Sequence, residues 1–226
     1  MTTLVPLSTG VSLEVKLSPP ANNDVHKLAV LLHPWSWLGG RWNDPVLQML
    51  MKPLYSRGYH VLRYNSRGVG RSTGWASLTG LNEASDLNAL IEWGTAQVGN
   101  VRSIVVLGYS YGSLIASLQP ILPNIPTSHI LLSYPLGVRG WLTLFKSRYA
   151  EALKELLANP SSNVLVVFGD SDQFTGVSSY RTWKSTLEAT PTTGGKLRFV
   201  EVKGGSHFWR DEAGDELVEL VSEWVP

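Results

Sequence analysis

The sequence contains no cysteine and almost no excess of charge of either sign. Without cysteine, the chain cannot form a disulfide, a thiolate metal site or a cysteine nucleophile. Nineteen basic and eighteen acidic side chains leave a formal net charge of +1. Because no cluster of lysine and arginine occurs along the chain, we expect no nucleic-acid partner.

Long apolar segments are also missing. No apolar run reaches the roughly 18 residues of a membrane-spanning helix. The first residues, MTTLVPLSTG, have neither the basic nor the long apolar part of a secretory signal. These absences predict a cytoplasmic protein without a membrane span. Charged residues make up 16% of the 226 residues and hydrophobic residues 43%, which favours a compact protein with much buried surface.

Short β-rich runs alternate with helical patterns along the chain. Several of the runs, such as IVVL and VLVVF, are apolar without alternation, which is typical of strands buried on both faces of a parallel sheet. We therefore predict an α/β fold with a mostly parallel central sheet, helices on both faces and a single domain over residues 1–226. The predicted strands are residues 11–17, 28–33, 59–65, 103–107, 128–134, 164–168 and 197–202.

Three helices are indicated by their ends and by apolar residues at helical spacing. Asp44 is a candidate N-cap followed by proline, and Pro53 is expected to kink or end that helix. Asn82 is a candidate N-cap for a second helix. The last helix is expected to begin at Asp211, whose charge suits the positive end of the helix dipole.

Residues 106–117, VLGYSYGSLIAS, contain a Gly-x-Ser-x-Gly pattern centred on Ser110. The pattern alone is weak, because a chain of this glycine and serine content produces it by chance in about one case in five. Here it directly follows an apolar strand and precedes a helix-like segment, which is the setting of a nucleophile elbow. Such a turn presents Ser110 at the carboxyl edge of the sheet, beside the N-terminus of a helix.

A serine hydroxyl needs a base to take its proton, and histidine is the usual base. Of the five histidines, only His207 lies in a glycine-containing loop just past the last predicted strand. His33 ends an early strand and precedes a proline, a position better suited to shaping a loop. The base needs a carboxylate partner, and both Asp170 and Asp172 follow the strand that ends at residue 168.

Together these segments resemble the α/β-hydrolase superfamily, in particular small members with little lid and a His-Pro oxyanion loop. RYNSRGVGRSTG looks like the family's Arg-Gly-x-Gly-x-Ser loop, with Arg67, Gly68, Gly70 and Ser72 at its positions. LLHPWSWLGG resembles the oxyanion loop, and VVFGDSDQF and GGSHFW resemble the segments that carry the acid and the histidine. The resemblance covers residues 28–226 and is specific for the superfamily rather than for a substrate.

The resemblance implies a catalytic role for three side chains. Ser110 matches the nucleophile and His207 the base. The family's usual Gly-x-x-Asp spacing favours Asp172 as the acid, which leaves Asp170 as the alternative or as a turn residue. The chain order of serine, acid and histidine agrees with the superfamily.

The resemblance also implies an oxyanion hole made of backbone N–H groups. Tyr111, directly after the nucleophile, would supply the first. Pro34 has no N–H, so Trp35 is the nearest second donor and Ser36 the alternative. Arg67 is expected to brace neighbouring loops rather than to act on the substrate.

Nine tryptophans are many for this length. Because open α/β sheets bind ligands at the carboxyl ends of their strands, we expect Trp37, Trp141 and Trp209 to line an apolar or aromatic pocket there. The alternative is that these indoles cover the end of the sheet as core. Residues 138–163 are expected to form a short lid-like insertion, since relatives with large caps carry much more chain at this place.

The sequence thus predicts a serine hydrolase that cleaves carboxylic esters through an acyl-enzyme, with no metal and no organic cofactor. Its partner would be a small-molecule ester with a small, apolar or aromatic group. Thioesters, lactones and small peptides are cleaved by the same machinery. The alternative function is a non-catalytic ligand-binding protein that retains the hydrolase fold. The sequence makes no prediction of oligomeric state.

Overall fold

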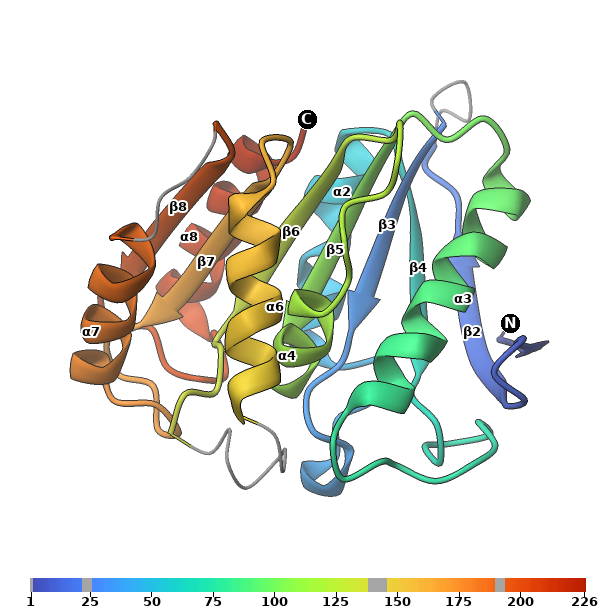
Figure 1. Ribbon diagram of the computed structural model, residues 1–226, viewed down its shortest axis with the longest axis horizontal. Helices are drawn as coiled ribbons and strands as arrows, with labels where there is room; N and C mark the ends of the chain where they lie inside the picture. The colour runs from blue at the N-terminus through green and yellow to red at the C-terminus, as the bar shows by residue number, and fades with distance from the viewer. Residues whose placement is uncertain (1, 22–25, 138–145, 190–193) are drawn as a thin grey trace.

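A computed structural model describes residues 2–21, 26–137, 146–189 and 194–226. Eight strands form one sheet at its centre, in the order β1-β2-β4-β3-β5-β6-β7-β8 (Figure 1). The strands are β1 (Thr3–Pro6), β2 (Ser12–Ser18), β3 (Lys27–Leu32), β4 (Tyr59–Asn65), β5 (Ser103–Tyr109), β6 (Thr127–Leu132), β7 (Asn163–Gly169) and β8 (Lys196–Val202). Strands β3 to β8 run parallel, and only β1 and β2 at one edge pair antiparallel.

Helices cover both faces of this sheet. On the face turned to the viewer in Figure 1 lie α3 (Leu81–Val98), α4 (Tyr111–Ser117), α6 (Lys146–Ala158) and α7 (Val177–Glu188). On the opposite face lie α1 (Pro45–Met49), α2 (Met51–Ser56) and α8 (Asp211–Trp224). A short 3-10 helix, η1 (Ser36–Leu38), follows β3. The predicted fold class, a mostly parallel sheet between two helical layers, is confirmed.

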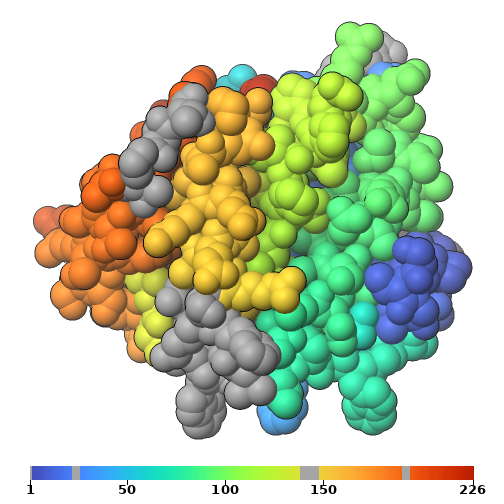
Figure 2. All heavy atoms as spheres, viewed as in Figure 1, coloured from blue at the N-terminus to red at the C-terminus, as the bar shows by residue number. Residues whose placement is uncertain are grey.

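The apolar strands supply a separate core on each face. In β5, Ile104 and Val106 pack on one side, and Val105 and Leu107 on the other. All four side chains are fully buried, and burial of such a side chain stabilises a fold by about 1.5–3 kcal/mol. A strand buried on both faces cannot alternate between polar and apolar residues, which explains the continuous run IVVL. In Figure 2 the side chains of the front helices cover the sheet.

The first predicted helix is present but divided into α1 and α2. The Asp44 side chain caps α1 by accepting the Val46 N–H at 2.9 Å, as expected from the sequence. Pro53 has no N–H, and its ring crowds the carbonyl group of Met49, four residues before it. The helix is interrupted at Leu50 and continues as α2. The interruption expected from Pro53 therefore occurs about one turn before the proline.

The predicted start of α3 at Asn82 is wrong. The helix begins at Leu81, and Gly80 is the N-cap with a φ of 73°. A side chain at position 80 would also clash with the hydroxyl group of Tyr149, which donates a hydrogen bond to the Thr79 carbonyl. Glycine is therefore required at position 80 by the packing of Tyr149, whose hydroxyl group bonds to a residue 70 positions earlier in the chain. The predicted start of α8 at Asp211 is confirmed.

The predicted lid-like insertion falls partly outside the described residues, which omit 138–145. Its described part is mostly α6, whose Tyr149 and Leu153 are buried in the core beside α4. This helix therefore covers a face of the sheet rather than its carboxyl edge. The single domain over residues 1–226 stays a prediction. Among the described helices, none is long and apolar enough to cross a lipid bilayer.

Two of the buried histidines, His33 and His129, lie outside the contacts of Ser110. His33 is 3% exposed, and its Nε2 accepts the Ser66 N–H at 3.0 Å. His129 is fully buried, with Nε2 2.9 Å from the Gln119 carbonyl oxygen. Burial lowers the pKa of His33 to about 4, although its hydrogen bond to the Pro34 carbonyl opposes the change. Burial lowers the pKa of His129 to about 4 as well.

Because of these two histidines, we expect acid to lower the stability of the folded protein. An unfolded histidine has a pKa of about 6.5, so between pH 6.5 and 4 the unfolded chain binds protons that the folded protein does not. The free energy of unfolding is therefore expected to decrease as the pH is lowered through this range, by up to about 3 kcal/mol for each histidine. Urea unfolding at pH 7 and pH 5 measures the effect, and His129→Gln should remove about half of it. Equal stability of the wild type at both pH values would contradict the prediction.

Candidate active site

Ser110 lies on the sharp turn between β5 and α4. These two elements meet at the lower edge of the sheet in Figure 1. Its backbone has a φ of 55° and a ψ of −121°, a conformation that is strained for any residue with a side chain. Surrounding hydrogen bonds hold it there. The Ser110 N–H donates to the Leu132 carbonyl at 2.9 Å, and its own carbonyl accepts the Ser113 N–H at 2.8 Å.

Close packing beside the turn explains the second glycine of the pattern. A side chain at Gly112 would clash with the carbonyl group of Leu32 at the end of β3. Only a residue without a side chain lets α4 start against the neighbouring strand. The expected strand, sharp turn and helix are therefore present, and they leave the Ser110 hydroxyl at the carboxyl edge of the sheet.

His207 lies in the loop between β8 and α8 and contacts both predicted partners. Its Nε2 is 3.0 Å from Ser110 Oγ, and its Nδ1 is 2.8 Å from Asp172 Oδ2. Its backbone is held as well: the N–H donates to Gln173 Oε1 at 3.0 Å, and the carbonyl accepts the Tyr109 hydroxyl at 2.8 Å. Sequence reasoning missed Gln173 and Tyr109, although each is next to a residue that it did select.

The two candidate acids after β7 differ in what they contact. Asp172 points one carboxylate oxygen to His207, and its other oxygen accepts the Phe174 N–H at 2.8 Å. Asp170 instead accepts the Gly204 N–H at 2.8 Å. Asp170 therefore ties the loop after β7 to the loop after β8, while Asp172 is the carboxylate in contact with the imidazole.

The two residues expected to supply oxyanion donors, Tyr111 and Trp35, lie at the start of α4 and in the loop after β3. Tyr111 is the first residue of α4, so its N–H has no carbonyl group one turn before it to bond with. Trp35 precedes η1, and its carbonyl accepts the N–H groups of Leu38 and Gly40, which closes the loop after β3. Trp35 lines the same cavity as Ser110, whereas Ser36 lines a neighbouring one.

A cavity of about 310 Å³ opens beside Ser110 and His207. Its walls are largely apolar or aromatic, and one carboxylate, Asp44, faces it. The ring of Phe174 lies 4.5 Å from the His207 ring, measured between centroids. The described lining residues are Pro34, Trp35, Leu38, Gly39, Gly40, Asp44, Tyr109, Ser110, Phe174, His207 and Phe208.

The tryptophans predicted to line this cavity do not do so where they are described. Trp37 is 79% exposed and stacks on the outer side of Trp35, with ring centroids 6.0 Å apart. Trp209 is 2% exposed, belongs to the core, and donates from Nε1 to Ser133 Oγ at 2.9 Å. For Trp209 the alternative of core packing is therefore correct. Trp141 lies outside the described residues.

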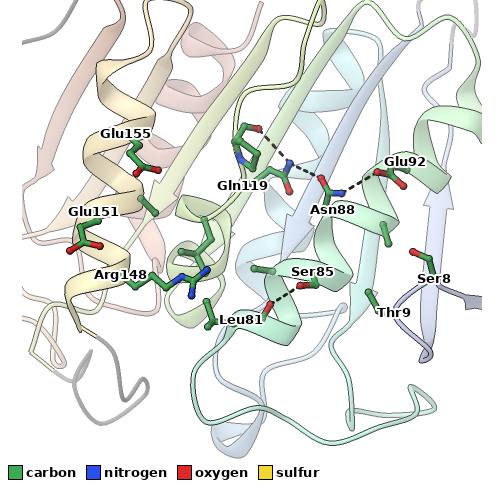
Figure 3. Close-up of a pocket in the computed structure, with 15 residues that line it drawn as sticks. Ser8, Thr9, Leu81, Ser85, Asn88, Glu92, Gln119, Arg148, Glu151 and Glu155 are labelled. Atoms are coloured by element: carbon green, nitrogen blue, oxygen red, sulfur yellow. Dashed lines mark hydrogen bonds between the residues drawn. The ribbon is translucent and has the colours of Figure 1, made fainter.

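A larger hollow of about 810 Å³ lies between α3 and α6, away from Ser110 (Figure 3). Its walls mix polar and apolar residues, and several of the polar side chains form hydrogen bonds with one another. Asn88 donates to Glu92 at 3.1 Å, while Arg148 points across from α6. None of its described lining residues also lines the cavity beside Ser110. Nowhere in the described ranges do three or more potential ligands form a metal site.

Arg67 braces the loop after β4, as expected. Its guanidinium makes two hydrogen bonds of 2.7 Å to the carboxylate of Asp86 on α3. Thr9 donates to the same carboxylate at 2.6 Å, which links the β1–β2 connection to this brace. Ser72, in the same predicted motif, donates to the Asn65 carbonyl at 2.7 Å. The motif therefore shapes the loops beside the elbow.

Fold and site together define an α/β-hydrolase with a small or absent lid. The chain belongs to the family of X-Pro dipeptidyl-peptidases (S15 family), which residues 9–121, half of the chain, match. These findings support a serine hydrolase in general terms.

Individual proteins are similar to this chain over most of its length. An uncharacterized protein of Rickettsia prowazekii is 28% identical over 199 residues, covering 88% of this chain and 78% of that protein. The structure of a Xanthomonas campestris α/β serine hydrolase without lid has a TM-score of 0.76 and 25% identity, covering 100% of this chain and 93% of that one. A Pyrococcus furiosus esterase has a TM-score of 0.73 and 20% identity, covering 99% and 90%.

Proposed function

We propose that this protein is a serine hydrolase that cleaves carboxylic esters through an acyl-enzyme. The observation that carries the proposal is the pair of contacts at His207, 3.0 Å to Ser110 Oγ and 2.8 Å to Asp172 Oδ2. These three residue types in this order of contact can activate a hydroxyl group as a nucleophile.

In the proposed reaction, Ser110 Oγ attacks the ester carbonyl carbon while His207 Nε2 takes the hydroxyl proton. The Nδ1–H of His207 donates to Asp172, which keeps Nε2 free to accept that proton and stabilises the imidazolium that forms. The imidazolium then protonates the leaving alcohol. In the second half, His207 takes a proton from water while the water oxygen attacks the acyl carbon. The bond from that carbon to Ser110 Oγ then breaks, and His207 returns the proton to Oγ, which releases the acid and restores the Ser110 hydroxyl.

Negative charge on the carbonyl oxygen would be bound by the N–H groups of Tyr111 and Trp35. Each donor of this kind lowers the barrier by about 3 kcal/mol in known hydrolases. The N-terminus of α4 adds a favourable dipole, because Tyr111 begins that helix. The unbonded position of the Tyr111 N–H at the helix start supports its part in this proposal.

The cavity supports small esters with an apolar or aromatic group. Its volume of about 310 Å³ is at the lower end of the range for small-molecule sites. Trp35, Phe174 and Phe208 contribute aromatic surface to its walls. The fold resembles that of an esterase from Pyrococcus furiosus, whereas the family carries the name of a peptidase. The polar contacts within the cluster argue against the alternative of a non-catalytic binding protein, which has no need of all three side chains.

A substrate panel tests the choice between esters and peptides. We expect kcat/KM for p-nitrophenyl esters to peak at short or medium acyl chains and to fall by roughly tenfold or more for chains too long for the cavity. An X-Pro p-nitroanilide should be cleaved at least about 100-fold more slowly than the best ester, because the amide is the less reactive acyl donor. Faster cleavage of the p-nitroanilide would reassign the substrate class to peptides.

A further inference from the structure

One feature of the cavity has no place in the proposed chemistry. Asp44 faces the same space as Ser110 and His207, and it is the only carboxylate among the described lining residues. The other titratable groups that line the cavity are His207 and Tyr109. A charged group in a largely apolar pocket is the kind of group that selects between ligands, because an unmatched ligand leaves it without a partner.

Capping of α1 does not account for the charge of Asp44. The cap is a hydrogen bond from the Val46 N–H to Asp44 Oδ1 at 2.9 Å. Asparagine caps a helix about as well as aspartate does, so a neutral side chain would satisfy this role. The negative charge therefore calls for a different explanation.

The carboxylate also has no basic partner among the side chains that the structure describes. Within the described ranges, no lysine or arginine forms an ion pair with Asp44. Burial raises the pKa of Asp44, although the N–H groups of Val46 and Leu47 and the nearby His207 oppose this. A half-buried carboxylate without a cation is unfavourable, and a cation bound in the cavity would relieve that cost.

The walls around Asp44 suit such a cation. Trp35, Phe174 and Phe208 line the cavity with it, and aromatic faces attract cationic groups, with quaternary ammonium ligands as the best-known case. Of these, Phe208 already has a guanidinium over its ring, that of Arg210 at 5.9 Å. A carboxylate combined with aromatic surface is a recognised way of binding an organic ammonium group.

We propose that this cavity selects esters that carry an aliphatic ammonium group, and that Asp44 is the specificity-determining residue. The inference rests on the proposed esterase function and adds a substrate class to it. The ammonium group would lie between the Asp44 carboxylate and the aromatic wall, while the ester carbonyl lies against Ser110.

Two pairs of esters of nearly equal shape test this selection. One pair varies the acyl group: the p-nitrophenyl esters of ε-aminohexanoic acid and of heptanoic acid. The other pair varies the alcohol: butyrylcholine and 3,3-dimethylbutyl butyrate, in which a carbon atom replaces the charged nitrogen. In at least one pair, the wild type should prefer the cationic ester by about tenfold in kcat/KM. Asp44→Asn, which preserves the cap, should remove that preference.

Asp215→Asn provides the matched control, because Asp215 is exposed on α8 and does not line the cavity. This variant loses the same charge and should keep the wild-type ratio of kcat/KM values. The inference is overturned if neither pair shows a preference for the cation. It is also overturned if Asp44→Asn keeps the preference, or if Asp215→Asn loses it to the same extent.

A binding measurement separates this inference from the proposed reaction. Calorimetry with butyltrimethylammonium ion on the Ser110→Ala protein needs no turnover, and adding Asp44→Asn should weaken binding by about tenfold. Equal binding by the two proteins would overturn the role of Asp44 even if esters are cleaved. Conversely, turnover that is unaffected by Ser110→Ala would overturn the proposed reaction, while the calorimetry would still decide the ammonium site.

Discussion

Replacing Ser110 with alanine is expected to lower kcat for an activated ester by roughly 10⁴-fold or more and to abolish covalent labelling by a fluorophosphonate probe. The reason is that the acyl-enzyme cannot form without the Ser110 hydroxyl, which lies 3.0 Å from His207 Nε2. Residual activity would come from the oxyanion donors and from substrate binding alone. Burst kinetics with a p-nitrophenyl ester and gel detection of the probe measure the two effects.

Ser117→Ala is the matched control for this experiment. Ser117 is a buried serine at the end of α4, the helix that follows Ser110, and its hydroxyl donates to the Leu114 carbonyl at 2.8 Å, away from His207. This variant should label and turn over like the wild type, with a loss of stability of about 1 kcal/mol. Labelling that persists in folded Ser110→Ala protein would show that another residue is the nucleophile.

The contacts at Ser110 could be anticipated because each partner is marked by a local pattern at the end of a strand. Ser110 follows β5, Asp172 follows β7 and His207 follows β8. The carboxyl ends of parallel strands meet at one edge of a sheet, so the parallel sheet brings together residues 97 positions apart in the chain. The buried apolar runs were sufficient to predict that sheet.

Other features depend on contacts that no local pattern encodes. The edge strand β1 has four residues, of which only Val5 is buried, so its apolar signal is too short to detect. Gly80 rather than Asn82 precedes α3 because Tyr149 packs against it from α6. In both cases, tertiary packing decides a boundary that residue preferences leave open.

The sequence predicted that aromatic side chains line the cavity, but it did not predict which ones. Trp209 has a φ of 48° and its indole lies in the core with α8, while its neighbour Phe208 lines the cavity. Successive residues in an irregular loop have no fixed period, so the sequence could not show which of the two side chains lines the cavity. Asp44 was recognised only as a cap, because its exposure to the cavity depends on the path of the loop after β3.

Replacing Asp172 with asparagine should lower kcat by roughly 10⁴-fold while changing KM much less. In the wild-type protein, Asp172 Oδ2 is 2.8 Å from His207 Nδ1 and accepts its proton in a hydrogen bond. An asparagine amide could instead donate to Nδ1, which moves the imidazole proton to Nε2. The imidazole could then no longer accept the proton of Ser110, so the loss would fall on the chemical step rather than on substrate binding.

Asp170→Asn makes the comparison decisive, because it removes the same charge two residues away. The Asp170 side chain accepts the Gly204 N–H at 2.8 Å, and the oxygen of an asparagine amide can accept that bond as well. We therefore expect this variant to lose less than about tenfold in kcat. Unfolding curves of both variants show whether either change acts through stability. If Asp170→Asn were the more damaging change, or if Asp172→Asn kept near-normal turnover, His207 would be oriented by some other group, and the contact between Asp172 and His207 would be structural.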